Sequence, residues 1–156
     1  MKYTNTENFD HEQPGRIGVL ITNLGTPEAP ERGAVRRYLK EFLSDPRVVE
    51  LPRVLWWLIL NGIILTIRPS RSAAAYRSVW TDAGSPLLLH TQAQAEGLRN
   101  TLEQRFPGKV TVRFAMRYGN PSMPDVLQAM LDGGVRKLAV LPLYPQYRAT
   151  TPASTF

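Results

Sequence analysis

A nearly continuous apolar run at residues 17–24 is the feature that most restricts how this chain can fold. The run ends at Gly25-Thr26-Pro27, where glycine and proline impose a special backbone. Consecutive apolar residues are typical of a strand in a parallel sheet that helices cover on both faces. Ligands of such sheets bind at the carboxyl ends of the strands, so we expect the function to lie at this edge.

Two later segments repeat the arrangement of a strand followed by a loop. Residues 110–118 alternate apolar and polar side chains, which predicts a strand with one more polar face, and Asn120-Pro121 ends it. Residues 137–141 form the third predicted strand. Pro142 cannot donate a ladder hydrogen bond, so we place it at the carboxyl end of that strand.

Helical patterns separate the three strands. Residues 30–44 carry apolar side chains at helical spacing, and an alanine-rich helical stretch runs through Tyr76. Residues 88–106 form a long helix, and Ser122 with Asp125 resembles the capping box of a shorter one. This order of elements predicts the α/β class, with three layers in which a parallel sheet lies between helices on both faces.

The composition is that of one globular domain with a basic surface. The 156 residues carry a formal net charge of +6, which favours anionic partners without choosing among nucleic acid, anionic lipid and an acidic small molecule. Nucleic acid is the weakest of the three, because the aromatic residues lie mostly in apolar runs. With no cysteine, the chain holds no disulfide and no thiolate metal site. Residues 1–16 are polar and are expected to form a flexible tail.

The longest apolar run starts at Val54 and ends at Leu65, and it includes Trp56 and Trp57. At 12 residues it is too short to cross a bilayer, which needs about 20. Two interpretations stay open. The run is either a core helix, the more usual outcome, or an amphipathic segment that lies in a membrane interface, where tryptophan is favoured.

Arg117 and Tyr118 are the candidate binding residues that the chemistry favours most. Both lie at the end of a predicted strand, where a guanidinium can bind a carboxylate and a phenol can stack or form a hydrogen bond. A surface ion pair and a half-buried tyrosine are about equally good explanations. Arg68 and Arg71 belong to a basic cluster that, taken alone, is more typical of a solvated face.

Five motifs in the same order resemble those in the amino-terminal half of bacterial ferrochelatases. They are Leu20-Ile21-Thr22-Asn23-Leu24-Gly25-Thr26-Pro27-Glu28, Tyr38-Leu39-Lys40-Glu41-Phe42-Leu43-Ser44-Asp45, Gly84-Ser85-Pro86, Met116-Arg117-Tyr118 and Leu143-Tyr144-Pro145-Gln146-Tyr147. The resemblance implies a chelatase-like, Rossmann-like half of a protein with two similar α/β domains. On that basis residues 17–156 are one domain, truncated at its end, and the second domain is absent.

The activity that the resemblance implies is the insertion of Fe²⁺ into protoporphyrin IX, the last step of protohaem synthesis, by a lyase. By position, Arg68, Tyr76 and Ser85 resemble family residues near the porphyrin and its propionates. Arg117 and Tyr118 resemble a pair that lines the cleft on the side where the metal enters. Arg71 matches a basic position of the same lip less closely.

The family's catalytic histidine and its acidic partner correspond to positions beyond Phe156, so no catalytic residue and no metal ligand is expected in this chain. Fe²⁺ is a substrate, and no bound cofactor is expected. Ala149 stands where some relatives place a cluster-binding cysteine, so no iron–sulfur cluster is expected either. The partners are protoporphyrin IX and Fe²⁺, with no nucleic acid.

Residues 54–65 correspond to a mobile lip by which some relatives touch the membrane. The location that we expect from the resemblance is the cytoplasm. Peripheral contact with the inner membrane is the further option that the lip leaves open. Two alternatives to the enzyme stay open: a non-catalytic module that binds porphyrin or membrane, and a chelatase for a related tetrapyrrole.

Overall fold

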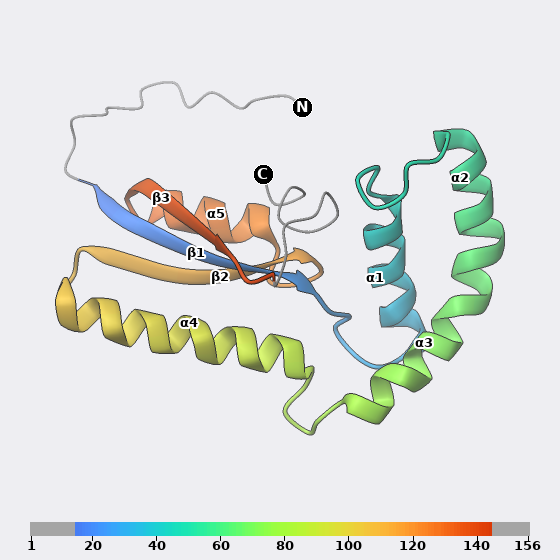
Figure 1. The fold of residues 1–156 in the computed structure, drawn as a ribbon, viewed down its shortest axis with the longest axis horizontal. Helices are drawn as coiled ribbons and strands as arrows, with labels where there is room; N and C mark the ends of the chain where they lie inside the picture. Colours follow the sequence, from blue (N-terminus) through green and yellow to red (C-terminus); the bar gives the residue numbers. More distant parts are fainter. Residues whose placement is uncertain (1–14, 145–156) are drawn as a thin grey trace.

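The computed structural model describes residues 15–144. They form a parallel sheet of three strands in the order β2-β1-β3, flanked by helices (Figure 1). The strands are β1 (Arg16–Gly25), β2 (Val110–Tyr118) and β3 (Val135–Pro142). The predicted parallel sheet is confirmed, and Pro142 is the last residue of β3.

Helices α4 (Pro86–Arg105) and α5 (Met123–Asp132) cover the opposite faces of the sheet (Figure 1). On the α4 side, Ile21 and Val112 pack with Ala95 in one apolar cluster. On the α5 side, Leu20 packs with Met130 in another. Neighbouring residues of β1 thus point to opposite faces and are both buried, which explains why the β1 sequence is apolar without alternation. The predicted three-layer α/β fold is confirmed.

A second group of helices lies beyond the carboxyl ends of the strands (Figure 1). It consists of α1 (Arg32–Ser44), α2 (Arg53–Ile59), the π-helical turn η1 (Leu60–Ile64) and α3 (Leu65–Val79). Leu43, Leu60 and Leu65 form its buried cluster. This group places side chains next to the edge of the sheet where the function is expected.

Helix α3 continues through Pro69, a residue that cannot donate a helical hydrogen bond. The carbonyl that loses this donor belongs to Leu65, and the Arg36 Nε donates to it instead at 3.2 Å. Pro69 is buried, and the bond from α1 ties the two helices together at this point. The helix therefore extends to Val79, three residues past the predicted stretch that ran through Tyr76.

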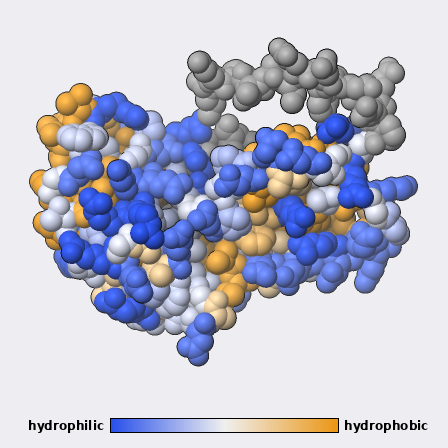
Figure 2. Space-filling view, turned by 180° about the vertical axis from the view of Figure 1, so that it is seen from behind, coloured by the Kyte–Doolittle hydropathy of each residue, from blue (hydrophilic) through white to orange (hydrophobic). Residues whose placement is uncertain are grey.

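The apolar segment 54–65 is divided between core and surface. Trp56 packs against the cluster of Leu43 and Leu60, and its indole N–H donates to the Leu43 carbonyl at 2.7 Å. Trp57 is 62% exposed and Val54 is 76% exposed. Viewed from behind, the end of the molecule built by α2 carries much of this apolar surface (Figure 2). Within residues 15–144, no helix is both long enough and apolar enough to cross a membrane.

Candidate functional site

The candidate site is built where β1 and β2 end side by side. Gly25 pairs in register with Tyr118, the last residue of β2. A Cβ atom at Gly25 would fall on the Tyr118 carbonyl, and the Gly25 φ of +111° suits glycine alone. Glycine is therefore needed here for two reasons, and it brings the loop after β1 close to the end of β2.

Arg117 and Tyr118 share one carboxylate, that of Asp45 at the end of α1. The Asp45 Oδ2 accepts from the Arg117 Nη2 at 2.6 Å and from the Tyr118 hydroxyl at 3.0 Å. The Arg117 guanidinium also lies over the Tyr118 ring, 4.7 Å from its centroid. The arrangement joins the end of β2 to the end of α1 and holds the guanidinium in one orientation.

This group opens onto solvent through a cavity of about 510 Å³. Arg117, Tyr118 and Asp45 line it, together with Arg47 from the segment after α1. The Arg117 side chain is 26% exposed, so part of it faces this cavity, while its buried Nε has no hydrogen-bond partner in the described residues. The lining carries two arginines, Arg47 and Arg117, beside the carboxylates of Glu41 and Asp45, and a guanidinium in such a cavity can bind a carboxylate of a ligand.

Tyr76 and Ser85 lie on the other side of α1. The Ser85 hydroxyl, which is buried at the start of α4, accepts from the Thr26 hydroxyl at 2.9 Å. Tyr76 lies edge-on to Trp80, with 6.1 Å between the ring centroids. Ser85 therefore fixes the loop after β1 against α4, in addition to any contact with a ligand.

Aromatic rings of α1 connect the two groups. Phe42 lies edge-on to Tyr118 at 5.1 Å and stacks with Tyr38 at 6.2 Å. The Tyr38 hydroxyl donates to the Gly25 carbonyl at 3.1 Å, and burial raises the pKa of Tyr38 well above its usual value. Burial also raises the pKa of Tyr76, and an interaction with Tyr38 opposes part of that rise. Four of the five predicted site residues thus lie around the Gly25 end of the sheet.

Arg68 is the predicted site residue that the structure does not join to the others. It is exposed on α3, as is Arg71 one turn later. In the described part of the chain neither guanidinium forms a hydrogen bond or ion pair. Both are therefore available to an anionic ligand that approaches α3.

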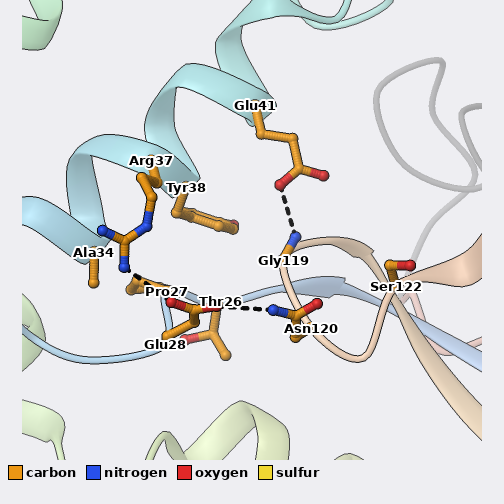
Figure 3. A pocket seen from close by; sticks show the side chains of 10 residues that line it. All are labelled: Thr26, Pro27, Glu28, Ala34, Arg37, Tyr38, Glu41, Gly119, Asn120 and Ser122. Carbon is orange, nitrogen blue, oxygen red and sulfur yellow. Dashed lines mark hydrogen bonds and ion pairs between the residues drawn. The ribbon is translucent and has the colours of Figure 1, made fainter. Parts of the chain in front are cut away.

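A smaller pocket of about 250 Å³ lies beside Tyr38 (Figure 3). Two of its charged groups form an ion pair: Glu28 accepts from Arg37 at 2.9 Å, and it also accepts from the Asn120 side chain at 2.8 Å. The Arg37 and Asn120 side chains together hold the pKa of Glu28 below its usual value. The Glu41 carboxylate accepts from the Gly119 N–H at 3.0 Å. These bonds hold the turn after β2 against α1 and the β1–α1 loop.

Sequence reasoning missed Asp45, Tyr38 and Thr26 as parts of this arrangement. From the sequence, Asp45 was expected only to end the helix that starts at residue 30, although it belongs to one of the five motifs. Its importance depends on Arg117 and Tyr118, which are more than 70 positions away. Among residues 15–144, no three histidine, cysteine or acidic side chains gather as a metal site. Ala149 and Phe156 lie outside the described residues.

Comparison with known proteins gives a family match over nearly the whole chain. The ferrochelatase family profile matches residues 16–156. The ferrochelatase of Marinobacter nauticus is 64% identical over 156 residues, which are 100% of this chain and 42% of that protein. The ferrochelatase of Alcanivorax borkumensis is 62% identical over the same length, 46% of that protein. The ferrochelatase of Chromobacterium violaceum is 53% identical over 98% of this chain. The chain spans less than half the length of these relatives.

Proposed function

Because the chain belongs to the ferrochelatase family, we propose that it is the amino-terminal half of an enzyme that inserts Fe²⁺ into protoporphyrin IX. The observation that carries the proposal is the family match over residues 16–156. The cavity beside Arg117 and Tyr118 supports it, because Arg47 and Arg117 line it and the propionates of a porphyrin need basic donors.

Each porphyrin-binding residue has a proposed role that follows from its surroundings. Arg68 and Arg71 bind propionates, since both are exposed and unpaired in the described residues. Arg117 and Tyr118 line the cavity, with the guanidinium carbon 4.7 Å from the centroid of the ring. Ser85 lines a separate pocket near Thr26, and Tyr76 lies against Trp80, which lines the same pocket. Binding energy from these contacts can be used to distort the macrocycle, which turns a pyrrole nitrogen toward the metal.

Insertion of Fe²⁺ displaces two pyrrole protons, so the reaction needs a proton acceptor. Asp45 is the carboxylate nearest to Arg117, and it already accepts from Arg117 and Tyr118. The likeness to ferrochelatases suggests another acceptor, and on that ground we propose a histidine with an acidic partner at positions that correspond to chain beyond Phe156. The 156 residues alone are then inactive. No iron–sulfur cluster takes part on this proposal, and the chain has no cysteine to bind one.

The apolar end of the molecule that α2 builds supports the proposal of peripheral contact with a membrane. Val54, Trp57 and Leu58 are exposed on α2, and the unpaired Arg68 lies further along the same succession of helices. We place the protein in the cytoplasm, with this end touching the inner membrane.

Trp57→Ser should lower co-sedimentation with anionic vesicles, because an exposed tryptophan adds apolar area to the contact. Equal co-sedimentation of the variant and the parent would rule out this surface.

The decisive experiment is an Fe²⁺ insertion assay on the complete protein encoded by the reading frame that contains this sequence. Protoporphyrin IX and Fe²⁺ are supplied, and protohaem is followed by its absorbance. We expect saturable turnover above the rate without protein. Porphyrin binding without turnover would favour the non-catalytic binding module, and turnover with a different tetrapyrrole alone would favour a related chelatase.

A further inference from the structure

Asp45 occupies a position that the proposed function does not yet explain. Its side chain is 11% exposed, and it accepts three hydrogen bonds. Arg117 and Tyr118 donate to its Oδ2, and the Arg47 N–H donates to its Oδ1 at 2.8 Å. A carboxylate with three donors and little exposure is confined to one orientation.

Because Asp45 is held in one orientation, the Arg117 guanidinium bonded to it is held as well. An arginine side chain has many rotamers, and ordering it during a reaction costs entropy. Here the bond to Asp45 and the Tyr118 ring at 4.7 Å hold the guanidinium before any ligand arrives. The Arg117 side chain stays 26% exposed and lines the cavity, so the oriented guanidinium remains within reach of a ligand there. A donor that is already oriented contributes more to a reaction than a mobile one.

We propose that Asp45 is a positioning residue that sets the orientation of Arg117 for the porphyrin. The inference rests on the proposed function, because it takes Arg117 to be the group that meets the macrocycle. Tyr118 contributes to this positioning in two ways. Its ring supports the guanidinium from one side, and its hydroxyl donates to the Asp45 carboxylate and fixes it. In this role Asp45 acts through Arg117, to which its carboxylate is bonded.

The competing explanation is that Asp45 only fastens α1 to the end of β2. The chain offers a matched control for that explanation. Glu28 fastens the β1–α1 loop to Asn120, three residues after Arg117, and its hydrogen-bond partners are Asn120 and Arg37. Glu28→Gln therefore removes a carboxylate from the same region and leaves the Asp45 group intact.

The test is a double-mutant cycle in the complete protein, with Asp45→Asn and Arg117→Ala measured singly and together by kcat/KM for the porphyrin. Asp45→Asn should lower kcat/KM about tenfold or more, the size typical of residues that orient a functional group. In the Arg117→Ala background the same change should have almost no further effect, because Asp45 then has no guanidinium to orient. Glu28→Gln should stay close to the parent.

Three results would overturn the positioning role: parental kcat/KM in Asp45→Asn, equal losses in both backgrounds, or an equal loss in Glu28→Gln. If Asp45→Asn does not fold, Asp45→Glu replaces it, since it keeps the charge and displaces the carboxylate by one methylene. The same non-additive pattern is expected of that variant. A parent protein that inserts no Fe²⁺ overturns the proposed function and this role together, whereas an active parent with an unaffected variant overturns this role alone.

Discussion

At the scale of single residues, the site depends on pairs that are distant in the sequence. Asp45 and Arg117 are 72 positions apart, and their atoms lie 2.6 Å apart at the ends of α1 and β2. The pair is partly buried, with the Arg117 side chain 26% exposed. Arg117 thus has a structural partner as well as a cavity to face. Its replacement should affect both stability and binding.

Arg117→Ala should weaken porphyrin binding and leave the protein folded. The free energy of unfolding should fall by about 1–3 kcal/mol, because Asp45 loses its charged donor while Tyr118 and the Arg47 N–H still donate to it. Porphyrin fluorescence titration and urea unfolding measure the two effects. Arg113→Ala is the control, since Arg113 is an exposed arginine of the same strand. An unchanged titration with folded Arg117→Ala would remove Arg117 from the site.

Tyr38 makes stability sensitive to alkaline pH. Burial raises its pKa in the folded protein, so the folded state keeps the phenol proton at pH values where the unfolded state has begun to release it. The unfolded state then binds fewer protons, and stability falls as pH rises above about 10, the ordinary pKa of tyrosine. This contribution is fully present below that pH.

Tyr38→Phe should therefore flatten the loss of stability above about pH 10. At pH 7 the variant should be less stable than the parent by about 1 kcal/mol, because the hydrogen bond to the Gly25 carbonyl is lost. Urea unfolding from pH 7 to pH 11 measures both effects. Parallel curves for the two proteins across this range would show that Tyr38 does not govern the alkaline response.

At the scale of elements, adjacent tryptophans of α2 serve different purposes. Trp56 packs on the cluster around Leu43 and donates its indole N–H to a carbonyl there. Trp57, one residue later, points outward and is 62% exposed. The two interpretations of the apolar run, core helix and surface segment, thus apply to different residues of one helix. The core role of Trp56 is seen directly, whereas the membrane role of Trp57 stays a proposal.

Trp56→Ser should lower the free energy of unfolding by about 3 kcal/mol, since it removes a large packed ring and leaves the Leu43 carbonyl without its donor. Trp57→Ser should change it by less than about 0.5 kcal/mol, as is usual for exposed positions. Urea unfolding of both variants measures the difference. Similar losses for the two would mean that the outward face of α2 is also packed.

At the scale of the whole molecule, the described residues form a sheet with the candidate site residues gathered at one edge. The chain spans less than half the length of its ferrochelatase relatives. On the proposed function, the 156 residues supply one wall of the porphyrin cleft and no proton acceptor. This chain studied alone should therefore bind the porphyrin without inserting the metal.

The isolated 156-residue chain should bind protoporphyrin IX saturably and insert no Fe²⁺. Porphyrin fluorescence during titration measures binding, and haem absorbance after addition of Fe²⁺ measures insertion. The Arg117→Ala chain is the control for binding at the site rather than at the apolar end. Turnover by the isolated chain would contradict the placement of the proton acceptor beyond Phe156, and absence of binding would mean that one wall is not enough.

Most of the fold could be predicted from the sequence, because it follows from local patterns. The unbroken apolar run of β1 and the alternation in β2 both predicted strands that the structure contains. Ser122 accepts from the Asp125 N–H at the start of α5, as the capping pattern predicted. The π-helical turn η1 has no such local pattern and was not predicted. The structure also divides the apolar run between core and surface, a division that hydrophobicity alone cannot make.

The sequence by itself determined the class of fold and, through five ordered motifs, the family, and it proposed the edge of the sheet at which the candidate site lies. These properties depend on residue type and on spacing along the chain. Only the tertiary structure decided that Asp45 holds Arg117, that the Tyr38 hydroxyl is bound at Gly25, and that Trp56 is packed while Trp57 is exposed. Such contacts join distant positions through the docking of α1 and α2 beside the sheet, and no local pattern along the chain encodes them.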